Sequence, residues 1–287
     1  MSDAQILDRG YRRYEGPRGQ VWAAMRTLIR FSFERALGMR RGFWAKVIPA
    51  LIIVIAFLPA VVFIGIASLL PDAFAEAVPT YGDYYGFIVS ALVLYTAFLA
   101  PELLCNDRRT RLLGLYLASP LNRLTYLASK ALTAVLALSI ITIGPLLMLL
   151  LAYSLQGQGP GNVVDYLTLL GRIFLAGAAI TAIYTSLAFA VASFTDRMAV
   201  AAASIIMALL GSQVLTSVLV NGADWPVWMR LFSLVDLPLD IVERLYFGSN
   251  FGEPSISNWA YLVAIVAWSG VLSALVIRRY QRLDVTR

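Results

Sequence analysis

The sequence contains no histidine and only one cysteine, Cys105, among its 287 residues. Ser-His-Asp hydrolysis and histidine-based acid–base catalysis are therefore excluded, and so are the common zinc sites, which need several histidine or cysteine ligands. A lone cysteine cannot form a disulfide within the chain. The pattern Gly-x-x-x-x-Gly-Lys-Ser/Thr is also absent, so the chain lacks a nucleotide-phosphate loop of that kind. We expect no catalytic residue, no metal and no cofactor in this chain.

Charge is scarce as well: charged residues make up 14% of the chain and hydrophobic residues 60%, with a mean hydropathy of +0.75. A water-soluble domain of this composition would expose large apolar patches. The chain is thus predicted to be an integral membrane protein. Six apolar stretches reach the length of about 20 residues that a helix needs to cross about 30 Å of hydrocarbon. They lie at 47–70, 84–104, 131–153, 173–194, 199–220 and 259–277.

The predicted fold class is an all-α membrane protein in three parts. Residues 1–46 form a cytoplasmic arm and an interfacial amphipathic helix, residues 47–277 a six-span transmembrane domain, and residues 278–287 a cytoplasmic tail. From Gln20 onward, apolar residues recur at helical spacing opposite a polar face that begins with Arg26. This pattern is typical of a helix that lies in the membrane interface.

Residues 221–258, before the last span, are predicted to form a broken helical hairpin on the external side, either re-entrant or lying on the surface. The segment contains two amphipathic pieces interrupted at Pro238, each too short to cross the membrane, with aromatic residues that favour the headgroup layer. Asp236, Asp240 and Glu243 recur there at i, i+4 and i+7, on one helical face. They are candidates for an external gate or for binding a cationic group, although a plain solvated face has the same spacing.

The positive charge predicts the orientation of the chain. All but three of the 23 Lys and Arg residues lie in the termini or in alternate loops, the exceptions being Arg172, Arg230 and Arg244. Lys and Arg in short flanking loops are retained on the cytoplasmic side. Both termini are therefore predicted to be cytoplasmic, with the chain in the inner membrane of a cell. The net charge of +6 is attributed to this asymmetry and to anionic lipid headgroups, and nucleic acid is not an expected partner.

The loop between spans two and three, residues 105–130, is predicted to be a charged cytoplasmic helix that binds a partner. It offers charges at its start, an apolar stretch over 112–117, and Pro120, which ends the helix. An apolar patch between charges on an exposed helix usually marks a partner, although a loop that only sets topology would carry the same charges. The candidate docking residues are Asp107, Arg108, Arg109, Arg111, Leu115, Leu117, Pro120, Arg123 and Lys130.

Few polar groups are expected inside the membrane. Among ionisable residues only Glu102, a possible inner gate, and Arg172 come close to the core, whereas an ion pump or proton-coupled carrier would need more. The remaining polar groups are mild and suit an amphipathic or apolar cargo. Those considered as possible pathway residues are Thr96, Ser212, Gln213 and Thr216.

This order of elements resembles the ABC-2 type permeases, the membrane subunits of bacterial ABC exporters, over roughly residues 20–277. Asp107 stands at the family's acidic position after span two, Leu115 and Leu117 lie in its leucine-rich turn, and Pro120 opens its Pro-Leu-x-Arg motif, with Lys130 ten residues later. The family's Gly-Thr pair is replaced by Arg111-Leu112. The sequence Ser-Phe-Thr-Asp-Arg-Met-Ala at 193–199 also resembles the family's turn between spans four and five.

The resemblance implies a mechanism. Two permease subunits, either identical or related, pair in the membrane, and two separate P-loop ATPases, which hold ATP and Mg, dock on the coupling helix after span two. Closure of the ATPases drives these helices together and opens the path outward for a drug, lipid or similar cargo. The alternative from another class is a structural subunit that transmits force in an ABC-type complex without moving cargo. A membrane enzyme is disfavoured, because the spans carry no cluster of catalytic side chains.

Overall fold

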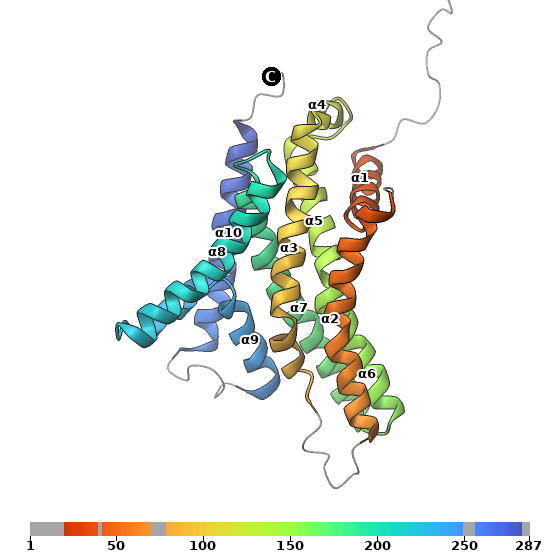
Figure 1. Cartoon of the computed structure of the whole chain (residues 1–287), viewed down its shortest axis with the longest axis vertical. Helices are drawn as coiled ribbons and strands as arrows, with labels where there is room; N and C mark the ends of the chain where they lie inside the picture. The colour runs from red at the N-terminus through yellow and green to blue at the C-terminus, as the bar shows by residue number, and fades with distance from the viewer. Residues whose placement is uncertain (1–19, 40–41, 70–78, 249–255, 283–287) are drawn as a thin grey trace, which may run out of the picture.

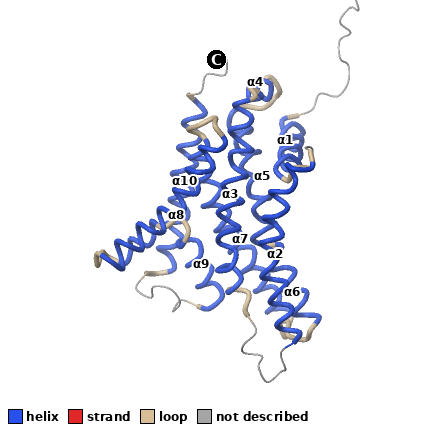
Figure 2. Tube along the Cα trace, in the orientation of Figure 1, coloured by secondary structure: helices blue, strands red, loops and turns tan. Residues whose placement is uncertain are grey.

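The computed structural model describes residues 20–39, 42–69, 79–248 and 256–282. All regular elements within these residues are helices (Figure 2). Six helical segments are long and apolar enough to cross a membrane, which confirms the six predicted spans. They are Lys46–Leu69, Asp83–Arg109, Arg123–Leu155, Val163–Ala192, Met198–Gly222 and Asn258–Gln281.

Ten α-helices are assigned within the described residues. In chain order they are α1 (Val21–Ala36), α2 (Phe43–Leu69), α3 (Asp83–Arg109), α4 (Leu112–Leu117), α5 (Arg123–Thr142), α6 (Gly144–Leu155), α7 (Val163–Ala192), α8 (Met198–Ser217), α9 (Asp236–Phe247) and α10 (Asn258–Gln281). A π-helix, η2 (Val218–Gly222), continues α8, and a 3-10 helix, η3 (Val227–Phe232), precedes α9.

The helix α3 lies at the centre of the bundle and packs against α2, α5, α7 and α8. α3 and α7 are the most buried spans, whereas α8 and α10 are among the least buried. In Figure 1, α8 leaves the bundle at an angle, and its far end stands away from the other spans. The third span is divided into α5 and α6 at Ile143, where Pro145 sits in the first turn of α6. Gly177 on α7 allows close contact there, because a Cβ atom at this position would lie 2.6 Å from Ile143 Cγ1.

We call the end of the bundle that carries α1, α4 and the last turn of α10 the basic end; it is uppermost in Figure 1. At this end α1 packs against α5 and α3 through Leu28, Ser32 and Ala36, three buried residues four positions apart. The predicted amphipathic helix is thus present, and one of its faces is covered by protein. The predicted arm over residues 1–19 lies outside the described residues.

The predicted loop 105–130 is shorter in the structure than the sequence indicated. Its first five residues belong to the last turns of α3, and its last eight belong to α5. The connection between these helices is therefore residues 110–122, with α4 in its middle. We call residues 110–122 the α3–α5 connection.

The broken hairpin also differs from the prediction in one respect. The break between its helical pieces, η3 and α9, lies at residues 233–235 rather than at Pro238. Pro238 is the third residue of α9, where its missing N–H is no loss because the first N–H groups of a helix have no intrahelical partner. Residues 249–255 of the predicted hairpin lie outside the described residues.

Candidate functional site

A buried cluster of charges links α1, α3 and α5 at the basic end. The Asp107 carboxylate on α3 lies 2.7 Å from Arg35 Nη2 on α1 and 2.6 Å from Lys130 Nζ on α5. Tyr126 donates a hydrogen bond of 2.9 Å to the Lys130-facing oxygen of Asp107. The side chains of Asp107 and Lys130 are 0% exposed. Charges removed from water in this way persist only when they are paired and hydrogen-bonded, as they are here.

Further contacts extend this cluster. Lys130 Nζ donates to Ser32 Oγ at 2.9 Å, and Arg35 donates to the Glu102 carbonyl at 3.0 Å. Arg35 Nε also lies 3.3 Å from Glu102 Oε1. The ammonium of Lys130 stands 5.5 Å from the centre of the Tyr116 ring, which belongs to α4. The cluster therefore connects the amphipathic helix with both helices that flank the α3–α5 connection, and with α4 itself.

The electrostatics of the cluster favour the charged form of Arg35. Burial lowers the pKa of Arg35, but the carboxylates of Asp107 and Glu102 outweigh that effect, so the net shift is upward. Burial raises the pKa of Tyr116, and the negative charge of Asp107 adds to this shift. Arg35 is thus a permanent cation, and Tyr116 a neutral hydroxyl, at the edge of the α3–α5 connection.

Arg108 points in another direction, toward the turn between α7 and α8. Its guanidinium donates to the carbonyl of Ser193 at 2.6 Å and to the carbonyls of Ala192 and Thr195. Its Nε lies 3.1 Å from Asp196 Oδ1. With 8% of its side chain exposed, Arg108 is a residue of the interior rather than of the docking surface.

Arg123 joins the first turn of α5 to the end of α10. Its Nη1 donates to the carbonyl of Tyr280 at 3.0 Å and to that of Gln281. Asn122 begins α5 with a capping box, in which Asn122 Oδ1 accepts from Thr125 N at 2.8 Å and Thr125 Oγ1 accepts from Asn122 N at 2.9 Å. The far end of the α3–α5 connection is therefore fixed as firmly as its beginning.

These placements correct part of the predicted docking surface. Asp107 and Lys130 pair with each other, and Arg108 binds backbone carbonyls, so none of the three can contact a docked protein in this conformation. Glu102, the predicted inner gate, is 0% exposed and belongs to the same cluster. Most of these charges were expected to be solvated, because hydropathy does not register pairing between residues that are distant in the sequence.

Other predicted docking residues do lie at the surface. Arg109, Arg111 and Pro120 are exposed, Leu115 is 69% exposed, and Leu117 is half-buried. Arg111 has a φ of 57°, a left-handed conformation that favours glycine. This is the position at which the resembled family has the glycine of its Gly-Thr pair. The chain makes its tight turn from α3 into α4 with an arginine at this position.

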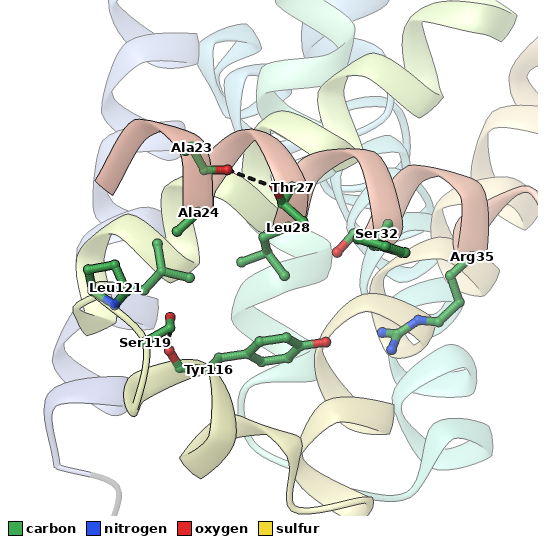
Figure 3. A pocket seen from close by; sticks show the side chains of 11 residues that line it. Ala23, Ala24, Thr27, Leu28, Ser32, Arg35, Tyr116, Ser119 and Leu121 are labelled. Carbon is green, nitrogen blue, oxygen red and sulfur yellow. Dashed lines mark hydrogen bonds between the residues drawn. The ribbon is translucent and has the colours of Figure 1, made fainter. Parts of the chain in front are cut away.

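A cavity of about 680 Å³ separates α1 from the end of the α3–α5 connection. Figure 3 shows α1 along one side, with Tyr116 and Ser119 across from it and Arg35 at one end. Leu28 and Phe31 of α1, together with Leu121, make most of the wall apolar. The cavity thus combines an apolar wall with one cationic end, next to the exposed face of α4.

At the opposite end of the bundle, α9 is joined to α10. Arg244 donates to Ile256 O and Asn258 Oδ1, both at 2.7 Å, and stacks over the Tyr261 ring at 4.5 Å. Tyr261 donates to Asp240 Oδ2 at 3.1 Å. Burial raises the pKa of Asp240 to about 6, with the hydrogen bond from Tyr261 opposing that shift and nearby carboxylates adding to it.

The predicted pathway and gate residues are only partly brought together. Gln213 on α8 donates to Asp236 Oδ1 at 2.7 Å, and Ser212 Oγ accepts from Leu234 N at 3.1 Å. Thr216 Oγ1 donates to the Ser212 carbonyl of its own helix at 2.9 Å. Thr96 is buried on α3. The three carboxylates do not share one surface, because Asp236 faces α8, Asp240 faces α10 and Glu243 is exposed.

The fold and this site define the chain as a multi-pass helical membrane protein, with an amphipathic helix and a short connecting helix gathered at one end of the bundle. The family model described as ABC-2 family transporter protein matches residues 72–275, and the chain belongs to this family. It is therefore a membrane permease of an ABC transporter. No curated protein matches the sequence significantly.

Sequence reasoning missed Arg35 and Ser32 as members of the site. The signal was present, because Leu28, Ser32 and Arg35 recur at i, i+4 and i+7 and so share a helical face. An arginine in line with the buried face of an amphipathic helix needs a carboxylate partner. The partner lies 72 positions later in the sequence, which one sequence alone does not indicate.

Proposed function

We propose that this chain is the permease subunit of an ATP-driven exporter that moves an amphipathic or apolar cargo outward. Separate ATPase subunits dock on the exposed face of α4 and the cavity beside it. ATP and Mg belong to those subunits, since this sequence lacks a phosphate-binding loop. A second permease subunit, identical or related, completes the transporter. Family membership supports the class, and the site described above supports the place of docking.

The observation that carries this proposal is the exposure of Leu115. This leucine is 69% exposed, follows the exposed Arg109 and Arg111, and stands on a helix that lies outside the six spans. Exposed leucines on the spans are expected to contact lipid, but this explanation does not apply to Leu115, which lies outside the spans. An apolar residue in such a charged setting is typical of a protein contact. The neighbouring cavity, with its largely apolar wall, suits the apolar face of an amphipathic segment of the partner.

The orientation is part of the same proposal. An ATPase in the cytoplasm requires the basic end, with α1 and α4, to face the cytoplasm. The concentration of Lys and Arg at this end supports that orientation. Both termini are then cytoplasmic, and α9 lies on the outer side of the cell membrane.

The proposal is tested by purifying the full chain from native membranes in mild detergent and identifying co-purified proteins by mass spectrometry. We expect a P-loop ATPase at about one copy per permease. The change Leu115→Asp should lower its recovery at least about tenfold, because a charge buried in a contact costs more than 1.4 kcal/mol. The matched control is Gln281→Asp, which adds the same charge at an exposed position of the basic end.

Two results contradict the proposal. If no ATPase accompanies the intact chain, the protein works alone and the exposed face of α4 has another role. If Leu115→Asp and Gln281→Asp retain the ATPase equally, docking occurs elsewhere. An ATPase that binds and hydrolyses ATP without any cargo being moved would favour the force-transmitting subunit over the exporter.

A further inference from the structure

The turn between α7 and α8, residues 193–197, is held from outside mainly by the side chain of Arg108. α7 ends at Ala192, and the last carbonyls of a helix have no intrahelical donors. Arg108 supplies a donor for the last of them, the carbonyl of Ala192, and donates as well to the carbonyls of Ser193 and Thr195 in the turn and pairs with Asp196. A positive charge is also favoured at the C-terminus of a helix by the helix dipole.

A second residue of α3 supports the same turn. Cys105, one helical turn before Arg108, donates from Sγ to the Thr195 carbonyl at 3.1 Å and is 0% exposed. The turn is thus packed directly against the last turn of α3. Because Arg108 is followed by only Arg109, Thr110 and Arg111 before α4 begins, this last turn lies next to the docking helix.

The turn is also the place from which α8 starts. α8 packs against α3 near the basic end, then leaves the bundle at an angle (Figure 1). Farther along α8, Gln213 donates to Asp236 at the start of α9. A continuous chain of contacts therefore runs from α4, through Arg108 and the turn, along α8 to α9.

We propose that Arg108 is the positioning residue that transmits a displacement of the α3–α5 connection to α8 and, through Gln213 and Asp236, to α9. This inference rests on the proposed function, because it needs an ATPase to displace α4. A guanidinium suits the task, since its planar array of donors can hold several carbonyls at once, whereas a lysine ammonium is a single point charge. Movement of the end of α3 then carries the turn with it.

The first test uses the only cysteine of the chain as a reporter of the Arg108 contacts. In wild-type protein Cys105 should react slowly with N-ethylmaleimide, because its sulfur is covered by the turn. Arg108→Gln should accelerate the reaction at least about tenfold, since losing a charged hydrogen bond shifts an opening equilibrium by that factor or more. Arg109→Gln, the same change at the neighbouring exposed position, should leave the rate unchanged. Equal rates in all three proteins would overturn the proposed role of Arg108.

The second test measures whether a movement at the basic end is transmitted to the opposite end. A residue with a purely structural role would leave this transmission unchanged. Spin-label pairs are placed at Thr110 and Gln281 for the basic end, and at Ala223 and Trp259 for the opposite end, all exposed and all in a Cys105→Ala background. Distances are measured in the complex with its co-purified ATPase, before and after addition of ATP and vanadate. In the reference protein we expect both distances to change.

In Arg108→Gln we expect the basic-end distance to change with ATP while the opposite-end distance stays fixed. If both distances change in Arg108→Gln as they do in the reference protein, this inference is overturned and the proposed function is left intact. A reference protein whose basic-end distance ignores ATP would overturn the proposed function and this inference together. If Arg108→Gln does not fold, Arg108→Lys keeps a positive charge near Asp196, but its single nitrogen cannot reach all the groups that the guanidinium contacts. The same two outcomes then decide.

Discussion

At the scale of single residues, the charges of this chain do two different kinds of work. Asp107 and Lys130 neutralise each other in the interior, whereas Arg109 and Arg111, a few positions away, face solvent. All four were predicted to lie on one docking surface. The difference follows from the helical geometry, because α3 turns Asp107 toward α5 and α1 and turns Arg109 away from them.

The buried pair gives the first prediction at this scale. Lys130→Met should destabilise the protein by about 3–5 kcal/mol, because Asp107 would lose a partner inside the bundle. The double change Asp107→Leu with Lys130→Met should cost less than the sum of the two single changes, since neither charge is then left unpaired. Equilibrium unfolding in detergent measures the cycle. Additive costs would show that the two charges are not coupled. The control is Arg30→Ala, which breaks an exposed ion pair and should change the free energy of unfolding by less than about 1 kcal/mol.

Arg111 gives a second prediction, in which glycine has opposite effects on stability at position 111 and at position 109. A residue other than glycine in the left-handed conformation costs about 1–2 kcal/mol, so Arg111→Gly should stabilise the fold by up to about 1 kcal/mol once the flexibility of unfolded glycine is counted. Arg109→Gly, at the last residue of α3, should destabilise it by up to about 1 kcal/mol, the cost of glycine inside a helix. Thermal unfolding of the two variants distinguishes them. A loss of stability in Arg111→Gly would mean that the Arg111 side chain makes a contact that outweighs its backbone conformation.

At the scale of elements, hydropathy predicted the six spans well and their ends poorly. The predicted second span ended at residue 104, yet α3 continues through charged residues to Arg109. The third span likewise begins at Arg123 rather than at residue 131. A hydropathy profile treats each charge as solvated, whereas Asp107 and Lys130 are paired across helices. That residues 105–130 bind a partner stays a prediction, and which of these residues lie inside the bundle depended on contacts between α1, α3 and α5.

α9 offers a prediction about pH at this scale. Burial raises the pKa of Asp240 to about 6 from its ordinary 3.8, with Asp236, Glu243, Arg230 and the hydrogen bond from Tyr261 modifying the shift. Asp240 is therefore protonated more readily in the folded than in the unfolded protein, which adds to the free energy of unfolding at low pH. This contribution is complete below about pH 3.8 and is lost as pH rises through about 6. It amounts to about 3 kcal/mol at most.

The pH dependence is measured by comparing unfolding at pH 5 and pH 7.5. The wild-type protein should be less stable at pH 7.5 through this residue, and Asp240→Asn should reduce the difference. Glu243→Gln is the control at an exposed position of the same helix, where a smaller effect is expected. A profile that is the same in wild type and Asp240→Asn would show that this carboxyl group does not favour its protonated form in the folded protein.

At the scale of the whole molecule, the two ends of the bundle are built differently. The basic end links its helices through ion pairs and guanidinium contacts, with Arg35, Arg108 and Arg123 each joining separate elements. The opposite end links α8, α9 and α10 mainly through hydrogen bonds and one stacked arginine. The basic end is thus held together by charged contacts, whereas α8 is partly separated from the other spans.

The proposed orientation makes the final prediction. Single cysteines introduced at Arg111 and at Asp224, both exposed and at opposite ends of the bundle, should react with a membrane-impermeant maleimide from opposite sides, since Cys105 is buried and contributes little background. In intact cells with a permeable outer layer, Asp224→Cys should be labelled and Arg111→Cys protected. Inverted membrane vesicles should give the reverse. Labelling of Arg111→Cys in intact cells would place α4 away from the cytoplasm, where no ATPase could reach it, and the positive charge of this end would then have no part in setting the topology.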